Sequence, residues 1–168
     1  QDLTATLERE FGQLHGVLHN AALLGRRTPL GQYPLDEWQK LLQVNLTAAF
    51  MMTQALLPLL MQADDASVIF TSSGVGRRGR AYWGAYAVTK FAVEGMAQVW
   101  AEELGSVSQV RINSINPGAT RTRMRADAYP GEDPATLKTP DDILPLYLYL
   151  MGPDSTGVTG QSLDAQPK

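Results

Sequence analysis

The sequence predicts an α/β protein in three layers, a doubly wound parallel sheet with helices on both faces. Short apolar runs that fit buried strands alternate with longer segments in which apolar residues recur every three or four positions. Such alternation is typical of parallel strands joined by helical crossovers. A length of 168 residues suffices for one domain with a sizeable core and is too short for two ordinary ones. We therefore expect residues 1–168 to form a single domain.

The first half of the chain predicts two helices and two strands. Glycine and proline delimit them, because glycine ends helices and proline favours their first turn. Each strand is a short apolar run without helical spacing. These elements are a helix ended by Gly12, a strand over residues 15–19, a long helix from Pro34 and Asp36 toward Pro58, and a strand over residues 67–71.

The second half continues the same alternation. Its longest helix carries small and apolar residues on one stripe, and its strands end at glycine- or proline-containing turns. The elements are a glycine-rich loop over residues 74–84, a helix over 85–104, a strand over 110–115 that ends at Pro117-Gly118, a polar segment with Pro130 and Pro134, a helix over 143–150 capped by Asp141 and Asp142, and a fourth strand over 161–164.

Composition excludes several classes of function. A net charge of -3 gives no general attraction to nucleic acid or anionic membranes. Without cysteine there is no disulfide or thiolate chemistry, and two histidines are too few for most zinc sites. The longest apolar stretch, residues 46–61, is interrupted by polar residues and falls short of the roughly 20 residues that cross a bilayer. We expect no metal, no nucleic-acid partner, no signal peptide, no membrane span and a cytoplasmic location.

Residues 74–79 read GVGRRG, which matches the glycine pattern of dinucleotide-binding loops and follows a predicted strand. In such loops a helix begins within the motif, so that its N-terminal amides meet the pyrophosphate. Here arginines and a further turn intervene before the next helix, and no strand with a terminal acidic residue follows. We interpret the motif as a loop beside another site rather than as a phosphate cradle.

A serine, a tyrosine and a lysine are spaced so that they would meet at one edge of the sheet. Ser73 ends a predicted strand, where open α/β sheets place their ligands. Tyr86 and Lys90 are four residues apart on a predicted helix, so their side chains share a face. An adjacent ammonium lowers the pKa of a phenol, which is otherwise about 10. The three residues predict an acid/base site, with an exposed helical pair as the alternative interpretation of Tyr86 and Lys90.

Asn45 adds a fourth polar group. It falls on the apolar stripe of the long helix, four residues after Leu41 and three after Leu42, and is expected to point inward. Burying an amide costs about 1–3 kcal/mol unless it is hydrogen-bonded. Asn45 is therefore either a satisfied structural residue or part of the same polar site.

With these residues the chain resembles the short-chain dehydrogenases/reductases, in their compact single-domain branch with a Rossmann-like fold. Several motifs in the family's order make the resemblance specific. The later run KTPDDILPLYLYLM is most similar to a poorly characterised bacterial subgroup of oxidoreductases, described as oxoacyl-carrier-protein-reductase-like. The matching segments are HNAA at residues 19–22, LQVNL around Asn45, FTSSG around Ser73, YAVTK at residues 86–90, NPGATRT at residues 116–122 and VTGQSLD at residues 158–164.

The resemblance implies an NAD- or NADP-dependent carbonyl reductase or alcohol dehydrogenase. Tyr86 would exchange a proton with the substrate oxygen, and Lys90 would lower its pKa and bind the nicotinamide ribose. Ser73 would hydrogen-bond the substrate oxygen, and Asn45 would anchor a water that links Lys90 to solvent. A non-catalytic nucleotide-binding or scaffold protein on the same fold is the alternative. The implied cofactor contacts are Asn20, Tyr86, Lys90, Pro117, Gly118, Thr120 and Thr122.

The resemblance also implies partners. Members of the family associate through the long helices that correspond to residues 35–60 and 85–104. We therefore expect a homodimer or homotetramer that acts on a small carbonyl or alcohol compound. Three tryptophans are expected in the core or at a subunit interface rather than against the cofactor: Trp38, Trp83 and Trp100.

The sequence departs from the family pattern in two ways. The phosphate-binding loop and the first three strands are absent, so the chain supplies strands 4-5-6-7 of the family order 3-2-1-4-5-6-7, the C-terminal two thirds of the domain. We expect this polypeptide alone to bind dinucleotide poorly, and a preference for NAD or NADP is not readable. His19 and Ala22 replace Asn and Gly of the family's N-N-A-G. We interpret His19 as a strand-end residue with a satisfied ring, and expect Ala22 to cost about 1 kcal/mol if that position needs a positive φ.

Six arginines form two clusters next to the candidate site. If both loops border the site, they give a basic rim suited to an anionic substrate, such as an acyl thioester. Solvated arginines, or partners for Glu132 and Asp133, are the alternative. The clusters are Arg77, Arg78 and Arg80, and Arg121, Arg123 and Arg125.

Overall fold

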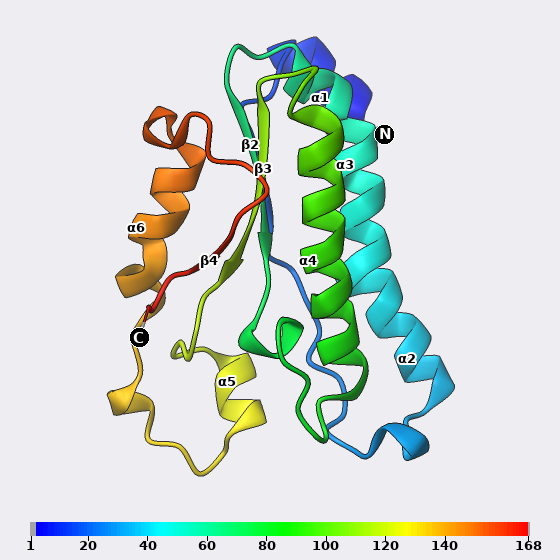
Figure 1. Cartoon of the computed structure of the whole chain (residues 1–168). Helices are drawn as coiled ribbons and strands as arrows, with labels where there is room; N and C mark the ends of the chain where they lie inside the picture. The colour runs from blue at the N-terminus through cyan, green and yellow to red at the C-terminus, as the bar shows by residue number, and fades with distance from the viewer. Residues whose placement is uncertain (1–2, 168) are drawn as a thin grey trace.

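The computed structural model describes residues 3–167. Its centre is a parallel sheet of four strands in the order β1-β2-β3-β4, which confirms the predicted fold class. Figure 1 shows the sheet edge-on between two layers of helices. The strands are β1 Gly16–His19, β2 Ala66–Thr71, β3 Val110–Asn116 and β4 Ser162–Asp164.

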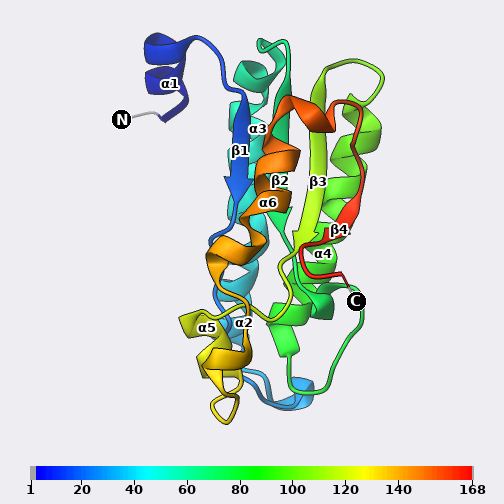
Figure 2. The ribbon, with the colours of Figure 1, turned by 90° about the vertical axis from the view of Figure 1, so that its left-hand side faces the viewer.

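Helices cover both faces of the sheet. Helices α3 and α4 lie on one face, and α6 lies on the other, which faces the viewer in Figure 2. Every predicted helix is present, with its ends shifted by a few residues. The helices are α1 Leu3–Phe11, α2 Leu35–Leu42, α3 Ala48–Met61, α4 Gly84–Leu104, α5 Arg123–Ala128 and α6 Pro140–Met151.

Strand β2 illustrates why the strands read as apolar runs. Val68 and Phe70 pack with α3 and α4, while Ile69 between them packs with α6. All three are at most 1% exposed, because side chains alternate across a sheet that is covered on both sides. Because all four strands are parallel, their carboxyl ends share one edge of the sheet.

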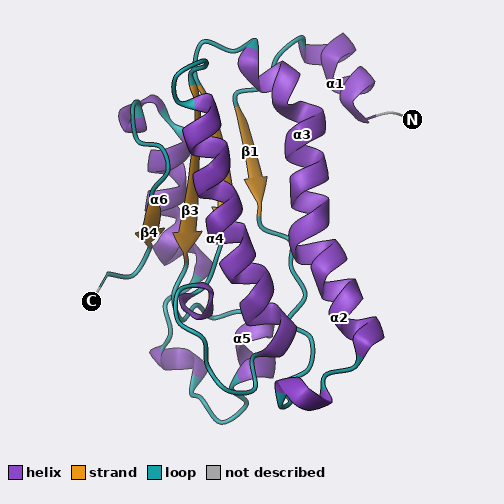
Figure 3. Ribbon diagram, turned by 45° about the vertical axis from the view of Figure 1, so that its right-hand side comes forward, coloured by secondary structure: helices purple, strands orange, loops and turns teal. Residues whose placement is uncertain are grey.

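The long predicted helix forms α2 and α3 joined by a π-helical turn, Gln43–Thr47, and it continues past Pro58 to Met61 (Figure 3). By length and composition the span Leu35–Met61, 27 residues with an 18-residue window of mean hydropathy 1.5, is long and apolar enough to cross a membrane. The prediction that this segment is too short to cross a membrane is therefore wrong by the criterion of helix length. In this structure Leu56 and Leu60 of the span are buried in the core beside the sheet, and core helices pass the same test.

Two local expectations need correction. Helix α6 is capped by Thr139 rather than by Asp141 and Asp142: the Thr139 hydroxyl accepts from the Asp142 N–H, and the Asp142 carboxylate accepts from the Thr139 N–H at 2.7 Å. The polar segment before it contains the unpredicted helix α5. Thr122 caps that helix by accepting from the Arg125 N–H at 3.2 Å.

Strand β1 lies at the edge of the sheet and pairs with β2 alone among the described strands. Its Leu18 is 45% exposed. The predicted open apolar edge is thus present along β1, and the exposed Leu18 lies near the carboxyl end of that strand.

Candidate active site

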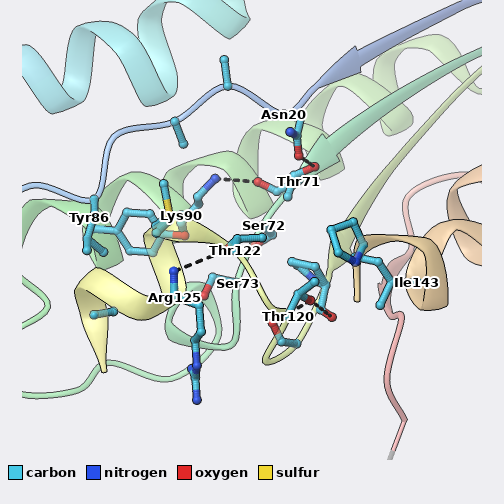
Figure 4. Close-up of a pocket in the computed structure, with 18 of the residues that line it drawn as sticks. Asn20, Thr71, Ser72, Ser73, Tyr86, Lys90, Thr120, Thr122, Arg125 and Ile143 are labelled. Atoms are coloured by element: carbon cyan, nitrogen blue, oxygen red, sulfur yellow. Dashed lines mark hydrogen bonds between the residues drawn. The ribbon is translucent and has the colours of Figure 1, made fainter. Parts of the chain in front are cut away.

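A cavity of about 630 Å³ lies where the strands end, bounded by the segments that follow β1, β2 and β3, by α4, and by α5 and α6. Ser73, Tyr86 and Lys90 all line it, and Figure 4 shows them on neighbouring walls. Three of the four residues predicted to converge are therefore together. The expected cofactor contacts outside that trio also line the cavity: Asn20, Pro117, Gly118, Thr120 and Thr122.

Ser73 stands at the first turn after β2. Its Oγ accepts from the Val75 N–H at 3.5 Å, which caps the short 3-10 turn Gly74–Gly76. Tyr86 enters from the first turn of α4, close enough for the Ser73 side chain to lower its pKa. The turn therefore directs the serine hydroxyl toward the phenol.

Burial raises the pKa of Tyr86 above its ordinary value, and the hydrogen bond with Ser73 lowers it in part. The lowering expected from the adjacent ammonium is therefore not seen in the chain without a cofactor. Tyr86 is 7% exposed, and the Lys90 Nζ lies 5.5 Å from the centroid of its ring, directed elsewhere. Desolvation therefore dominates, and a lowered pKa requires a further positive charge in the cavity.

Lys90 is a buried cation that is 4% exposed. Its Nζ donates to the carbonyl oxygen of Thr71, the last residue of β2, at 2.6 Å. Burial lowers the pKa of Lys90 to about 8, and the negative charge of Glu94, one turn further along α4, opposes that change. Lys90 is consequently held at the carboxyl end of the sheet and loses its proton more readily than an ordinary lysine.

Gly76 is the one glycine of the GVGRRG segment that close packing requires. A Cβ at this position would lie 2.9 Å from the backbone carbonyl atoms of Lys90. Glycine is needed because the turn after Ser73 packs directly against the backbone of α4. The helix itself begins only at Gly84, as the interpretation of the motif as a loop requires.

Asn45 lies behind Lys90 rather than in the main cavity. Its side chain accepts from the Leu23 N–H at 2.8 Å and donates to the Leu23 carbonyl at 2.9 Å and to the Thr89 hydroxyl at 3.2 Å. The amide is therefore a satisfied structural group that fastens the segment after β1 to α4. A second cavity of about 160 Å³ is lined by both Asn45 and Lys90, which is room for several waters.

The loop after β3 is held in a conformation that needs glycine. Gly118 has φ +73°, and the Gln166 amide donates to the carbonyls of Pro117 at 2.9 Å and Ala119 at 3.1 Å. On the opposite wall, Asn20 accepts from the Thr71 hydroxyl at 3.0 Å. These contacts fix both walls between which a ligand would lie.

The sequence reasoning missed other residues of the cavity wall. Ser72 is 1% exposed, and its Oγ has no hydrogen-bond partner within residues 3–167. A buried hydroxyl left in this state indicates a position that a bound polar group completes. Its place directly before Ser73 is the signal that would have found it. Other missed residues include Thr71, Trp83, Ile143 and Tyr147.

His19 is a structural residue, as interpreted from the sequence. Its ring stacks on Phe70 with centroids 4.8 Å apart, and burial lowers its pKa to about 4. The Thr53 hydroxyl donates to the Ala49 carbonyl, so the His19 Nε2–H donates to Thr53 Oγ1 at 2.9 Å. Ala22 has no positive φ, so the strain expected there does not arise.

The arginine clusters differ from the expected basic rim. Arg77 turns away from the cavity and pairs with Glu94 and Asp164, and Arg125 pairs with Glu132 at 2.6 Å. Of the six arginines, all within the described part of the chain, Arg125 alone lines the cavity.

Trp83 also differs from expectation, since it belongs to the core and lines the cavity at once. The Arg27 guanidinium lies 4.7 Å from its ring centroid and 5.1 Å from that of Tyr129. Arg27 also donates to the Ala128 carbonyl at the end of α5. This arrangement fastens α5 over the wall that Trp83 forms.

Within residues 3–167, no group of three or more His, Asp or Glu side chains is placed to hold a metal ion.

A family model described as enoyl-(acyl carrier protein) reductase matches residues 1–165. The chain is 56% identical over 167 residues to the uncharacterised oxidoreductase YciK of Escherichia coli, covering 99% of this chain and 66% of YciK. It is 37% identical to a 3-alpha-(or 20-beta)-hydroxysteroid dehydrogenase of Mycobacterium tuberculosis, covering 89% of this chain and 58% of that protein. The chain thus spans about two thirds or less of the curated relatives it matches.

Solved structures similar to this chain are also described as short chain dehydrogenases. A protein described as a short chain dehydrogenase from Pseudomonas syringae superposes with a TM-score of 0.96 at 60% identity, covering 98% of this chain and 67% of its own. A Shigella flexneri protein of the same description, in complex with NADP, superposes with a TM-score of 0.95 at 56% identity, covering 98% and 68%.

Proposed function

The chain belongs to the short-chain dehydrogenase/reductase family, and we propose that it is the C-terminal two thirds of a single-domain, NADP-dependent enzyme that interconverts a carbonyl and an alcohol. The observation that carries the proposal is the meeting of Ser73, Tyr86 and Lys90 in one cavity at the carboxyl end of the sheet. A hydroxyl, a phenol and a cation are the groups that polarise a carbonyl oxygen and supply it with a proton.

The chain's own residues fit the nicotinamide half of a dinucleotide. Asn20, Gly118 and Thr120 line opposite walls, and the unpartnered Ser72 hydroxyl offers a further hydrogen bond. When bound, the nicotinamide supplies or accepts the hydride. The complexes of similar Shigella flexneri and Escherichia coli proteins with NADP and NADPH support NADP as the cofactor.

In the reductive direction, the Ser73 hydroxyl and the Tyr86 phenol both donate hydrogen bonds to the carbonyl oxygen, and Tyr86 gives up its proton. Lys90 stabilises the phenolate that forms, and a bound nicotinamide would add positive charge to the same cavity. Waters in the second cavity, beside Lys90 and Asn45, return the proton from solvent. In the oxidative direction the same groups remove the alcohol proton.

The walls of the cavity favour an apolar carbonyl compound. Beyond Tyr86 they are formed by Leu24, Trp83, Met124 and Ala128. The positive charge of Arg125 is matched by Glu132, and it does not present a free cation. The names of relatives, among them hydroxysteroid dehydrogenases and a levodione reductase of Leifsonia aquatica, support a ring ketone or alcohol.

An anionic substrate such as an acyl thioester is the second candidate. It depends on the exposed Arg78 and Arg123, and the relation to a 3-oxoacyl-[acyl-carrier-protein] reductase of Thermotoga maritima, 27% identical, favours it. Replacing both arginines with alanine separates the two candidates. If the double variant loses kcat/KM for anionic ketones and keeps the wild-type kcat/KM for neutral ones, the anionic candidate is correct. An equal change of kcat/KM for both kinds of ketone excludes it.

We also propose a homodimer or homotetramer in the cytoplasm. Exposed apolar side chains on α3 and α4, among them Phe50 at 40% and Phe91 at 45%, support association through these helices.

The test uses the full-length protein that carries this segment. It is titrated with NADPH and NADH and then assayed on a panel of ketones, with Tyr86→Phe as the variant and the exposed Tyr82→Phe as its matched control. We expect turnover that Tyr86→Phe abolishes and Tyr82→Phe preserves. Cofactor binding without any Tyr86-dependent turnover would instead favour the non-catalytic scaffold.

A further inference from the structure

Arg77 occupies a position that the proposed chemistry does not use, and its contacts are numerous. Ser73 precedes the turn Gly74–Gly76, and Arg77 directly follows it. Its side chain is 30% exposed and is directed across the end of β4 rather than into the cavity. There it donates to the Ser162 hydroxyl at 2.9 Å and the Leu163 carbonyl at 3.1 Å.

One branch of these contacts leads to the helix that carries Tyr86 and Lys90. The Arg77 Nε lies 3.4 Å from the carboxylate of Glu94, which is 9% exposed. Glu94 follows Lys90 by one helical turn and also accepts from the hydroxyls of Ser114 at 2.6 Å and Ser162 at 2.5 Å. A buried carboxylate with three donors is a rigid anchor, because losing any donor leaves charge unsatisfied.

A second branch leads to the loop that lies across the cavity. The Arg77 Nη1 donates to Asp164 Oδ1 at 2.8 Å, and the same oxygen accepts from the Asn116 amide at 2.7 Å. The Asn116 amide oxygen in turn accepts from the Gly118 N–H at 3.1 Å. An unbroken series of hydrogen bonds therefore connects Arg77 to Gly118.

Arg77 thus joins three parts of the site that come from distant stretches of sequence. The turn behind Ser73 is pressed against Lys90 through Gly76, the α4 branch passes through Glu94, and the cofactor-loop branch passes through Asp164. The planar guanidinium suits this task, since its donors diverge in fixed directions that an ammonium lacks.

We propose that Arg77 is a positioning residue: it sets Ser73 against the Tyr86–Lys90 face of α4 and, through Asp164 and Asn116, sets the Gly118 loop relative to that face. The proposal rests on the proposed function for its kinetic consequences. Its structural consequence, the coupling of two loops, is independent of turnover.

The experiment compares four variants of the full-length protein. Arg77→Ala cuts both branches, Arg77→Lys keeps the charge without the fork, and Asp164→Asn weakens only the branch to Gly118. Arg80→Ala is the matched control, since Arg80 is an exposed arginine of the same loop away from the cavity. Each variant is assayed with NADPH and a neutral ketone, and its amide hydrogen exchange is measured at Gly76 and Gly118.

For Arg77→Ala we expect kcat to fall about 10- to 100-fold, because small displacements of reacting groups cost that much. Asp164→Asn is expected to raise KM for NADPH about 3- to 10-fold, the value of one hydrogen bond, with kcat within a factor of about two. Arg77→Lys is expected to restore less than half of the loss, and Arg80→Ala to match the wild type.

Hydrogen exchange tests the coupling without turnover. The Gly76 N–H donates to the Ser73 carbonyl at 2.8 Å and reports on the serine turn, while the Gly118 N–H reports on the cofactor loop. We expect Arg77→Ala to accelerate exchange at both amides and Asp164→Asn at Gly118 alone. Unchanged exchange at both amides in Arg77→Ala would overturn the proposal. So would full rescue by Arg77→Lys.

The experiments distinguish a failure of the proposed function from a failure of the positioning role of Arg77. If the wild type has no Tyr86-dependent ketone turnover, the proposed function is wrong, whatever the exchange data say. If turnover depends on Tyr86 but Arg77→Ala behaves as Arg80→Ala does, the positioning role alone is wrong. Should Arg77→Ala not fold, Asp164→Asn, at a carboxylate that is 44% exposed, decides the branch to Gly118 by itself.

Discussion

Replacing Lys90 with methionine should change how the stability of the protein depends on pH. Burial lowers the pKa of Lys90 from its ordinary 10.5 to about 8. The unfolded chain therefore binds more protons than the folded one between these values, and stability rises with pH across that window. At neutral pH the difference amounts to about 3 kcal/mol that the folded state loses by keeping this lysine charged and buried.

The assay is urea unfolding of wild type and Lys90→Met at several pH values. The stability of the wild type relative to the variant should rise by about 2 kcal/mol between about pH 7 and pH 9.5. Other titrating groups are common to both proteins and cancel to first order. Lys40→Met, at an exposed position on α2, is the control and should give a flat difference. A flat difference for Lys90→Met as well would refute the reasoning, because it would mean that Lys90 is not desolvated.

Three further variants test separate parts of the account. Gly76→Ala should lose about 1–3 kcal/mol of stability and most activity, since its Cβ would lie 2.9 Å from the backbone of Lys90; an alanine tolerated without loss would contradict the packing of this turn. Arg27→Ala should raise KM for a neutral ketone about 5-fold and leave the Kd of NADPH unchanged, because the packing of Arg27 over the rings of Trp83 and Tyr129 holds α5; an equal loss of cofactor affinity would show that its effect is not local. Ser73→Ala should lower kcat about 10- to 100-fold with an unchanged Kd for NADPH, by removing a donor to the carbonyl oxygen; retained kcat would exclude that role.

The parts of the site that depend on local spacing were predictable. Tyr86 and Lys90 share a face because they are one helical turn apart, and Ser73 meets them because parallel strands end at a common edge. The layers of the fold follow in the same way from apolar runs such as that of β2, which is buried on both faces.

The parts that depend on distant partners were not predictable. The polar partners of Asn45 are Leu23 and Thr89, and nothing in the helical stripe around Asn45 identifies them. Arg77 was expected at the rim of the cavity, yet Glu94 and Asp164 draw it to the end of β4. Side chains with several donors follow the nearest unsatisfied acceptor, and sequence spacing does not reveal where that acceptor lies.

The direction of the pKa shift of Tyr86 was also not predictable from the sequence. The proximity of Tyr86 and Lys90 suggested a lowered pKa for the phenol. In the structure burial raises the pKa of Tyr86, and the Lys90 ammonium donates to the Thr71 carbonyl instead. The balance between desolvation and a neighbouring charge depends on distance and exposure, which a sequence does not contain. We therefore propose that the phenol is activated only when the cofactor is bound.

The most direct test of the central claim is a single turnover of NADPH already bound to the full-length protein. A ketone is mixed with the complex and the loss of nicotinamide absorbance is followed in wild type, Tyr86→Phe and Tyr82→Phe. We expect rapid oxidation in wild type and Tyr82→Phe, and a rate at least about 100-fold lower in Tyr86→Phe, since the proton donor is gone. Equal rates in wild type and Tyr86→Phe would contradict the claim that Tyr86, beside Ser73 and Lys90, supplies that proton.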